Sequence, residues 1–158
     1  MDTAANQSSA IHSTFSVERT YPFPPSRVFT GFSNQGTKRR WFAEGEGWEV
    51  DEFTLDFRVG GWEISRFRFG DGPPMGNDTI FLDIVPDQRI VFAYTMTVEN
   101  RRISISLATV ELAPSGNGTR LTYTEQGTYF EGEDGTRERE RGIRELLEKL
   151  DEELQKTG

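Results

Sequence analysis

The chain of 158 residues contains no cysteine and a single histidine, His12. Without cysteine there can be no disulfide, thiolate metal site or thiol nucleophile, and this composition is compatible with a reducing compartment. We expect His12 to lie in an N-terminal tail, which would remove histidine-based triads and histidine-rich metal sites from the folded domain. We therefore expect no cofactor and no metal. Any catalysis would have to use carboxylates, tyrosines, arginines and bound water.

Positive charge and long apolar runs are also scarce. The formal net charge is −8, which repels phosphate backbones and anionic lipid heads, so neither nucleic acid nor a membrane surface is an expected partner. The apolar runs are too short to span a bilayer, and the first residues, MDTAANQSSAIHS, lack the basic start and apolar middle of a secretory signal. We predict a soluble, cytoplasmic protein that is a monomer or a homodimer.

The pattern along the chain predicts one α+β domain over residues 14–158, preceded by a disordered tail over 1–13. A first strand over 14–21 ends at a proline-rich turn, and two short helices follow, the second over about 34–42. From Trp48 onward the apolar period is two, and turn signals separate six further strands, which we place over 48–57, 61–69, 78–86, 89–99, 102–113 and 118–130.

The C-terminal stretch from Thr136 to Lys156 has the clearest helical pattern. The remaining face of this helix is almost entirely charged. Its apolar residues share one stripe: Ile143, Leu146, Leu147, Leu150 and Leu154. Such a helix is marginal alone, so its apolar stripe must pack on the sheet. A curved sheet that grips one helix leaves a gap, which is either filled by large side chains or open as a pocket. A glycine inside a helix is less favourable than alanine, so a helix that only had to pack would gain from alanine at position 142. We therefore predict that the N-terminal half of this helix, with Gly142, walls the gap and that the C-terminal half closes the core.

Two polar motifs have ordinary structural interpretations. Lys38, Arg39 and Arg40 form the main basic run, and we interpret it as a solvated face at a helix C-terminus. Arg58 precedes Gly60 and Gly61, and paired glycines after a strand predict a tight turn. A phosphate cradle is the less favoured interpretation of this motif, because no lysine-serine pair and no helix follow it.

Several side chains are candidates to line the gap. Leu121, Tyr123 and Glu125 share one face of the last strand, and a carboxylate inside a pocket rim is suited to acid or base chemistry, although pairing with an arginine explains it as well. The alternation in strand 61–69 gives no clear inner face without a bulge, so Arg66 points either inward or to solvent. The full set of candidate cavity residues is Trp41, Phe42, Arg66, Tyr94, Tyr123, Glu125, Tyr129 and Ile143.

Three segments resemble a known family: FTLDFRVGGW at 53–62, GTRLTYTE at 118–125 and GIRELLEKL at 142–150. They are similar to the bacterial branch of the family named after the activator of the heat-shock protein 90 ATPase, within the START-like or SRPBCC superfamily. The resemblance covers roughly residues 13–154 and implies the helix-grip fold: a curved antiparallel sheet of about six to seven strands around a long C-terminal helix. The family usually has Gly-Trp where this chain has Gly142-Ile143, and many relatives have a histidine where this chain has Glu125.

The resemblance and the residues together leave three hypotheses for function. The first is binding of a small, largely apolar ligand in the cavity between sheet and helix, with no catalysis. The second is a cyclase-like or hydrolase-like enzyme that uses Glu125 as acid or base. The third, implied by the family name, is a chaperone-interacting module with a role in stress response.

Overall fold

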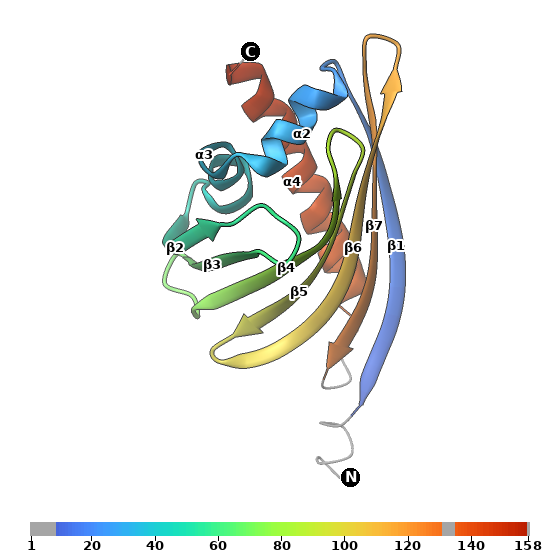
Figure 1. Cartoon of the computed structure of the whole chain (residues 1–158). Coiled ribbons are helices and arrows are strands. Elements are labelled where there is room, and N and C mark those ends of the chain that lie inside the picture. Colours follow the sequence, from blue (N-terminus) through green and yellow to red (C-terminus); the bar gives the residue numbers. More distant parts are fainter. Residues whose placement is uncertain (1–8, 131–134, 158) are drawn as a thin grey trace.

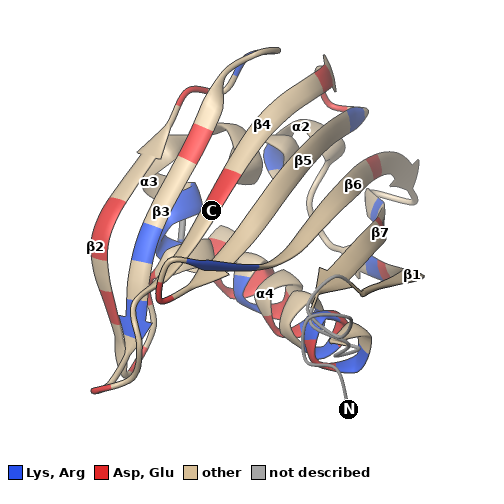
Figure 2. Ribbon diagram, turned by 90° about the horizontal axis from the view of Figure 1, so that it is seen from below, with Lys and Arg blue, Asp and Glu red and all other residues tan. Residues whose placement is uncertain are grey.

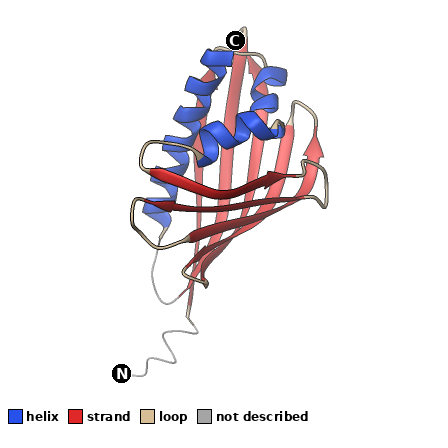
Figure 3. Cartoon of the chain, turned by 90° about the vertical axis from the view of Figure 1, so that its left-hand side faces the viewer, coloured by secondary structure: helices blue, strands red, loops and turns tan. Residues whose placement is uncertain are grey.

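The computed structural model describes residues 9–130 and 135–157, and it consists of one curved antiparallel sheet with all described helices on one side (Figures 1 and 3). The predicted α+β helix-grip architecture, with two short helical segments after the first strand, is confirmed. In chain order the elements are β1 (Ala10–Tyr21), α2 (Pro25–Ser33), α3 (Gln35–Lys38), the π-helical turn η1 (Arg39–Ala43), β2 (Trp48–Leu55), β3 (Trp62–Phe69), β4 (Met75–Val85), β5 (Arg89–Val98), β6 (Arg101–Ser115), β7 (Gly118–Phe130) and α4 (Thr136–Thr157).

Strand β1 begins earlier than the sequence pattern suggested. It starts at Ala10, so residues 10–13, which were expected in the tail, pair with β7, and residues 1–8 lie outside the described part. His12 is consequently a strand residue, exposed on β1, with its ring 3.4 Å from the Thr128 hydroxyl. The polar composition of this segment concealed the strand, because its order comes from backbone pairing with β7 rather than from its own apolar side chains.

The sheet has the strand order β1-β7-β6-β5-β4-β3-β2, and each strand pairs antiparallel with its neighbours. Strands β2 to β7 follow one another as hairpins, while β1 returns to pair with the last strand along its whole length, from Ala10 opposite Phe130 to Tyr21 opposite Thr119. The turn between β2 and β3 depends on glycine as predicted: Gly60 has φ of 84°, and a Cβ on Gly61 would lie 2.1 Å from the Asp56 carbonyl oxygen.

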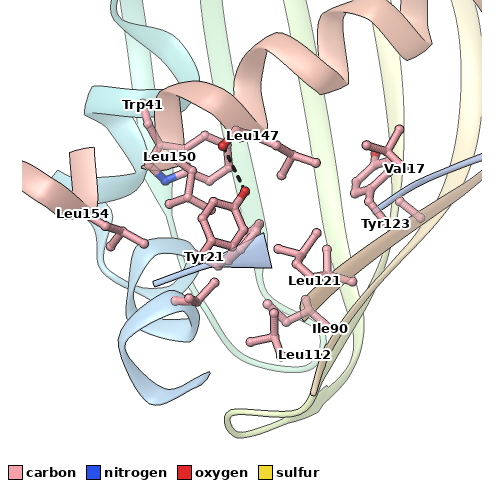
Figure 4. Close-up of a cluster of buried hydrophobic side chains, with 14 of the residues drawn as sticks. Val17, Tyr21, Trp41, Ile90, Leu112, Leu121, Tyr123, Leu147, Leu150 and Leu154 are labelled. Atoms are coloured by element: carbon pink, nitrogen blue, oxygen red, sulfur yellow. Dashed lines mark hydrogen bonds between the residues drawn. The ribbon is translucent and has the colours of Figure 1, made fainter. Parts of the chain in front are cut away.

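The core lies between the C-terminal half of α4 and the concave face of the sheet (Figure 4). Leu147, Leu150 and Leu154 are almost fully buried there, against β-strand side chains that include Tyr21 and Leu121. Each fully buried leucine contributes about 1.5–3 kcal/mol through the apolar surface that it removes from water. The Tyr21 hydroxyl also donates a 2.9 Å hydrogen bond to the Leu147 carbonyl, which anchors the end of β1 to the middle of the helix.

Charged residues are distributed unevenly among the described strands and helices (Figure 2). Acidic and basic residues gather on β2, β3 and α4, whereas the central strand β5 has a charged residue only at its first position, Arg89. Among the described residues, no helix has the length and apolar character that a membrane span requires.

Candidate functional site

A cavity of about 520 Å³ lies between the concave face of the sheet and the N-terminal half of α4. Most of its walls are aromatic or aliphatic, with side chains from α2, η1, β2 to β7 and α4. The aromatic residues of these walls include Trp41, Phe42, Phe67, Phe81, Phe92 and Tyr123. A volume of this size is within the range of about 300–1,000 Å³ that small-molecule sites occupy.

The π-helical turn η1 contributes Trp41, Phe42 and Ala43 to the cavity wall. The turn is closed by a 3.0 Å hydrogen bond from the Glu44 amide to the Arg39 carbonyl, an i to i+5 spacing that widens the helix by one residue. Trp41 is held by a 2.7 Å hydrogen bond from its indole nitrogen to the Gly31 carbonyl, and its ring packs edge-on against Phe42 at 5.9 Å. Both of these predicted cavity residues therefore have well-defined positions in the wall.

Helix α4 forms another wall, and its contribution agrees with the prediction from the sequence. Gly142 and Ile143 both border the cavity, whereas Leu150 and Leu154 pack in the core. A Cβ added to Gly142 would have no heavy atom within 4 Å, so this position faces open space. The small residue at this point of the stripe leaves volume that a larger side chain would occupy.

Behind the cavity wall lies a polar cluster centred on Glu125, which is fully buried. Its Oε1 accepts hydrogen bonds from the hydroxyls of Tyr123 at 2.6 Å and Tyr94 at 2.9 Å. Its Oε2 accepts from the hydroxyl of Ser106 at 2.9 Å and from Arg139 Nη1 at 3.1 Å. The carboxylate is therefore paired with an arginine and saturated with donors, which is the structural alternative that the sequence left open.

Burial determines the titration of the groups around Glu125. It raises the pKa of Tyr94 and Tyr123 well above the ordinary value of 10.0, and the negative charge of Glu125 raises both further. Burial alone would lower the pKa of Arg139, but the neighbouring Tyr94 and Glu125 outweigh it, so the pKa of Arg139 is raised. Both tyrosines thus remain hydrogen-bond donors and Arg139 remains a cation throughout the physiological range.

Lys38 corrects the interpretation of the basic run. It is only 7% exposed, borders the cavity and forms a 2.9 Å ion pair with Glu63, which is 2% exposed. Its ammonium also lies 4.6 Å from the centroid of the Phe42 ring, a cation–π distance. Lys38 is therefore not part of a solvated face, because α3 ends with this side chain directed at the sheet. Arg40 instead bonds to Glu153 on α4, at 2.6 Å.

The two faces of strand β3 account for the positions of both Glu63 and Arg66. Glu63, Ser65 and Phe67 face inward along the whole strand, and the bulge lies opposite, in β2 between Val50 and Glu52. Arg66 lies on the outer face, 2.6 Å from Asp78, and does not border the cavity. The alternation was ambiguous because a buried carboxylate, Glu63, occupies an inner position and a half-exposed tryptophan, Trp62, occupies an outer one.

Six of the eight candidate residues border the cavity: Trp41, Phe42, Tyr94, Tyr123, Tyr129 and Ile143. Glu125 lies behind the wall rather than at the rim, and Arg66 lies outside. The pattern missed Lys38, Glu63 and Arg139. Arg139 precedes Ile143 by four residues and so lies on the same face of the helix, but this spacing alone does not identify its buried partner. Among the described residues, no group of histidine, aspartate and glutamate could hold a metal ion.

Comparison with known proteins agrees with this geometry. A family model described as "Activator of Hsp90 ATPase homolog 1-like protein" matches residues 22–155. A crystal structure of a protein from Rhizobium loti is 57% identical, with a TM-score of 0.86 over 92% of this chain and 99% of that chain. A protein from Rhizobium leguminosarum is 36% identical, with a TM-score of 0.90 over 94% of this chain and 97% of that chain.

A more distant structural neighbour comes from the dynemicin biosynthetic locus. It is 17% identical, with a TM-score of 0.67 over 90% of this chain and 47% of that chain, so the likeness concerns the fold alone. Among curated proteins, none matches this chain.

Proposed function

The chain belongs to the Activator of Hsp90 ATPase homolog 1-like family, and we propose that within this fold it binds a small, largely apolar molecule in the cavity between the sheet and helix α4. The binding surface consists of the aromatic wall of η1, the inner face of β3 to β7 and the N-terminal half of α4. No chemical change of the bound molecule is part of this proposal.

The observation that carries the proposal is the open volume of about 520 Å³ with mainly apolar walls. Protein interiors are normally packed as densely as organic crystals, so an unfilled space of this size loses contacts that a larger side chain would supply. Gly142 is informative because alanine would be more favourable in a helix by about 1 kcal/mol and would meet no neighbour. The retained space is best accounted for by an occupant.

The arrangement around Glu125 gives no support to a catalytic role for this residue. Its two oxygens accept hydrogen bonds from Tyr94, Ser106, Tyr123 and Arg139, and it does not border the cavity. A general base must have a lone pair within reach of the proton that it abstracts. Glu125 instead joins β7, β6 and β5 to the start of α4, which fixes the shape of the cavity wall.

Thermal unfolding with a panel of flavonoids, polyketides and lipids tests the proposal. A bound molecule at about 100 times its dissociation constant stabilises the folded state by about 2.7 kcal/mol, so Tm should rise with the concentration of a true ligand. Ile143→Trp should fill the cavity and abolish this rise. Arg141→Trp, which places the same ring on an exposed position of the same helix, should retain it. An equal rise in both variants, or none in the wild type with any apolar compound, would contradict the proposal.

A further inference from the structure

The sheet wall of the cavity contains a compact polar patch on β3 and β4, where Glu63, Asn77 and Thr79 border the cavity. Glu63 and Ser65 on β3 lie directly opposite Thr79 and Asn77 on β4, so the four side chains form a block on the concave face. All four are buried, and Lys38 approaches Glu63 from α3. The inward positions on either side of the block are apolar, with Phe67 and Met75 at one end and Phe81 at the other.

Several hydrogen-bonding groups of this patch have unused capacity. An ammonium group has three donors, and Lys38 uses one of them, toward Glu63 Oε1 at 2.9 Å. Within residues 9–130 and 135–157, no donor contacts the second oxygen of Glu63. The Asn77 amide nitrogen contacts only the weak acceptor Met96 Sδ, at 3.4 Å. Buried polar groups normally have partners, so a bound molecule that supplies them would be favoured here.

The charges of the patch restrict what that molecule can carry. Lys38 and Glu63 already neutralise each other, so a carboxylate bound at this patch would lie beside Glu63 and an ammonium bound there would lie beside Lys38, each as a charge that the pair does not compensate. A hydroxyl avoids both costs because it accepts from Lys38 Nζ and donates to Glu63 Oε2 at the same time. Such hydrogen bonds to charged groups are stronger than those between neutral partners.

From this arrangement we infer that the ligand is a neutral alcohol or phenol, with its hydroxyl bound between Lys38 and Glu63 and its apolar body along the aromatic walls. The inference rests on the proposed function and specifies the class of molecule that the cavity selects. Simple hydrocarbons fill the same space without satisfying the patch, and fatty acids and other carboxylates are disfavoured at it.

Three probes with one ring system test the inference on the wild-type chain: 2-naphthol, 2-methylnaphthalene, in which a methyl group replaces the hydroxyl, and 2-naphthoate. Dissociation constants from NMR titrations at neutral pH provide the comparison. We expect 2-naphthol to bind about tenfold more tightly than 2-methylnaphthalene, because hydrogen bonds to charged groups are worth at least that factor. We expect 2-naphthoate to bind more weakly than 2-naphthol.

A double variant locates the source of the preference. In Lys38→Met with Glu63→Leu, the buried pair is replaced by apolar side chains, so 2-naphthol and 2-methylnaphthalene should bind almost equally. The matched control is Arg66→Met with Asp78→Leu, which removes an ion pair from the outer face of β3 and should leave the preference unchanged.

The outcomes separate this inference from the proposed function. Equal binding of 2-naphthol and 2-methylnaphthalene to the wild type, or tightest binding of 2-naphthoate, would overturn the inference and leave cavity binding intact. Binding of none of the three probes would contradict the proposed function as well. The comparison on the wild-type chain stands even if the double variant fails to fold.

Discussion

Arg139 Nη1 lies 3.1 Å from Glu125 Oε2, and this contact joins the first turns of helix α4 to the concave face of strand β7. The same guanidinium donates to the Tyr94 hydroxyl at 2.8 Å and to Ser104 at 2.7 Å. One arginine thus connects the helix to β5, β6 and β7. The position of the helical cavity wall depends on it.

Replacing Arg139 with methionine should lower the free energy of unfolding by about 3–5 kcal/mol, because Glu125 would remain as an unpaired buried charge. Urea denaturation measures the change. Arg144→Met is the matched control on the same helix, since Arg144 pairs with Glu140 at the surface and such pairs contribute about 0.3–0.5 kcal/mol. Similar losses in the two variants would show that the Glu125 cluster does not anchor the helix.

Two helical glycines should respond in opposite directions to alanine. Gly142→Ala should raise stability by about 1 kcal/mol, because helix propensity improves and the new Cβ meets nothing within 4 Å. Gly31→Ala should lower it by about 1–3 kcal/mol, because its Cβ would lie 2.7 Å from Leu150 Cδ1 in the packed core. Chemical denaturation of both variants tests the pair. A loss of stability in Gly142→Ala would mean that this position is packed rather than open.

Removing one partner of the buried Lys38–Glu63 ion pair should lower the free energy of unfolding more than replacing both partners. Lys38→Met alone should destabilise the protein by about 3–5 kcal/mol, since Glu63 would keep its charge without a partner. The double variant with Glu63→Leu should recover most of that loss, because two apolar side chains of similar volume replace the pair. Equal destabilisation by the single and double variants would indicate that Glu63 is solvated and not enclosed as described.

Alkaline pH should destabilise the fold through its buried tyrosines. Burial raises the pKa of Tyr21, Tyr94 and Tyr123 above the ordinary value of 10.0, at which they ionise in the unfolded chain. A raised folded-state pKa means that their contribution to stability is complete below pH 10 and is lost as the pH rises further. Tyrosinate absorbance from these residues should therefore appear together with the loss of circular dichroism.

The variant Tyr123→Phe isolates one of these groups. Well above pH 10, the free energy of unfolding should fall with pH less steeply in this variant than in the wild type. The difference between the two slopes should be about 1.36 kcal/mol per pH unit, because the variant releases one fewer proton on unfolding. The reverse outcome, complete tyrosinate formation in a chain with native circular dichroism, would mean that the hydroxyls reach solvent in the folded state.

The sequence predicted the architecture because its strongest signals are local. The stripe from Ile143 to Leu154 and the alternation after Trp48 depend on spacing within one element, and the structure contains the helix and strands that they indicate. The position of Gly142 at the cavity followed from local helix propensity, since a glycine inside a helix lowers its stability unless the position must stay small. Trp41 and Phe42, the paired aromatics at the end of the second short helix, were candidate cavity residues, and both border the cavity.

The polar part of the site could not be predicted in this way, because it depends on partners distant in the chain. Lys38 is buried because Glu63 lies opposite it, and nothing near either residue in the sequence distinguishes it from an exposed charge. Arg139 lies among five consecutive charged residues, from Arg137 to Arg141, of which it is the one that contacts Glu125. The orientation of Arg66 stayed open because alternation specifies two faces without saying which of them faces inward.

The indole N–H NMR signals of the three tryptophans report whether an apolar molecule binds in the cavity or elsewhere on the protein. Trp41 and Trp48 border the cavity, whereas Trp62 lies on the opposite face of the sheet, in an apolar row with Ile80, Ala93 and Leu107 that is an alternative surface for apolar molecules. We predict that titration with 2-naphthol shifts the Trp41 and Trp48 signals in a saturable manner and leaves Trp62 unchanged. A shift of Trp62 alone, with Trp41 unaffected, would mean that the molecule binds on the outer face of the sheet and not in the cavity.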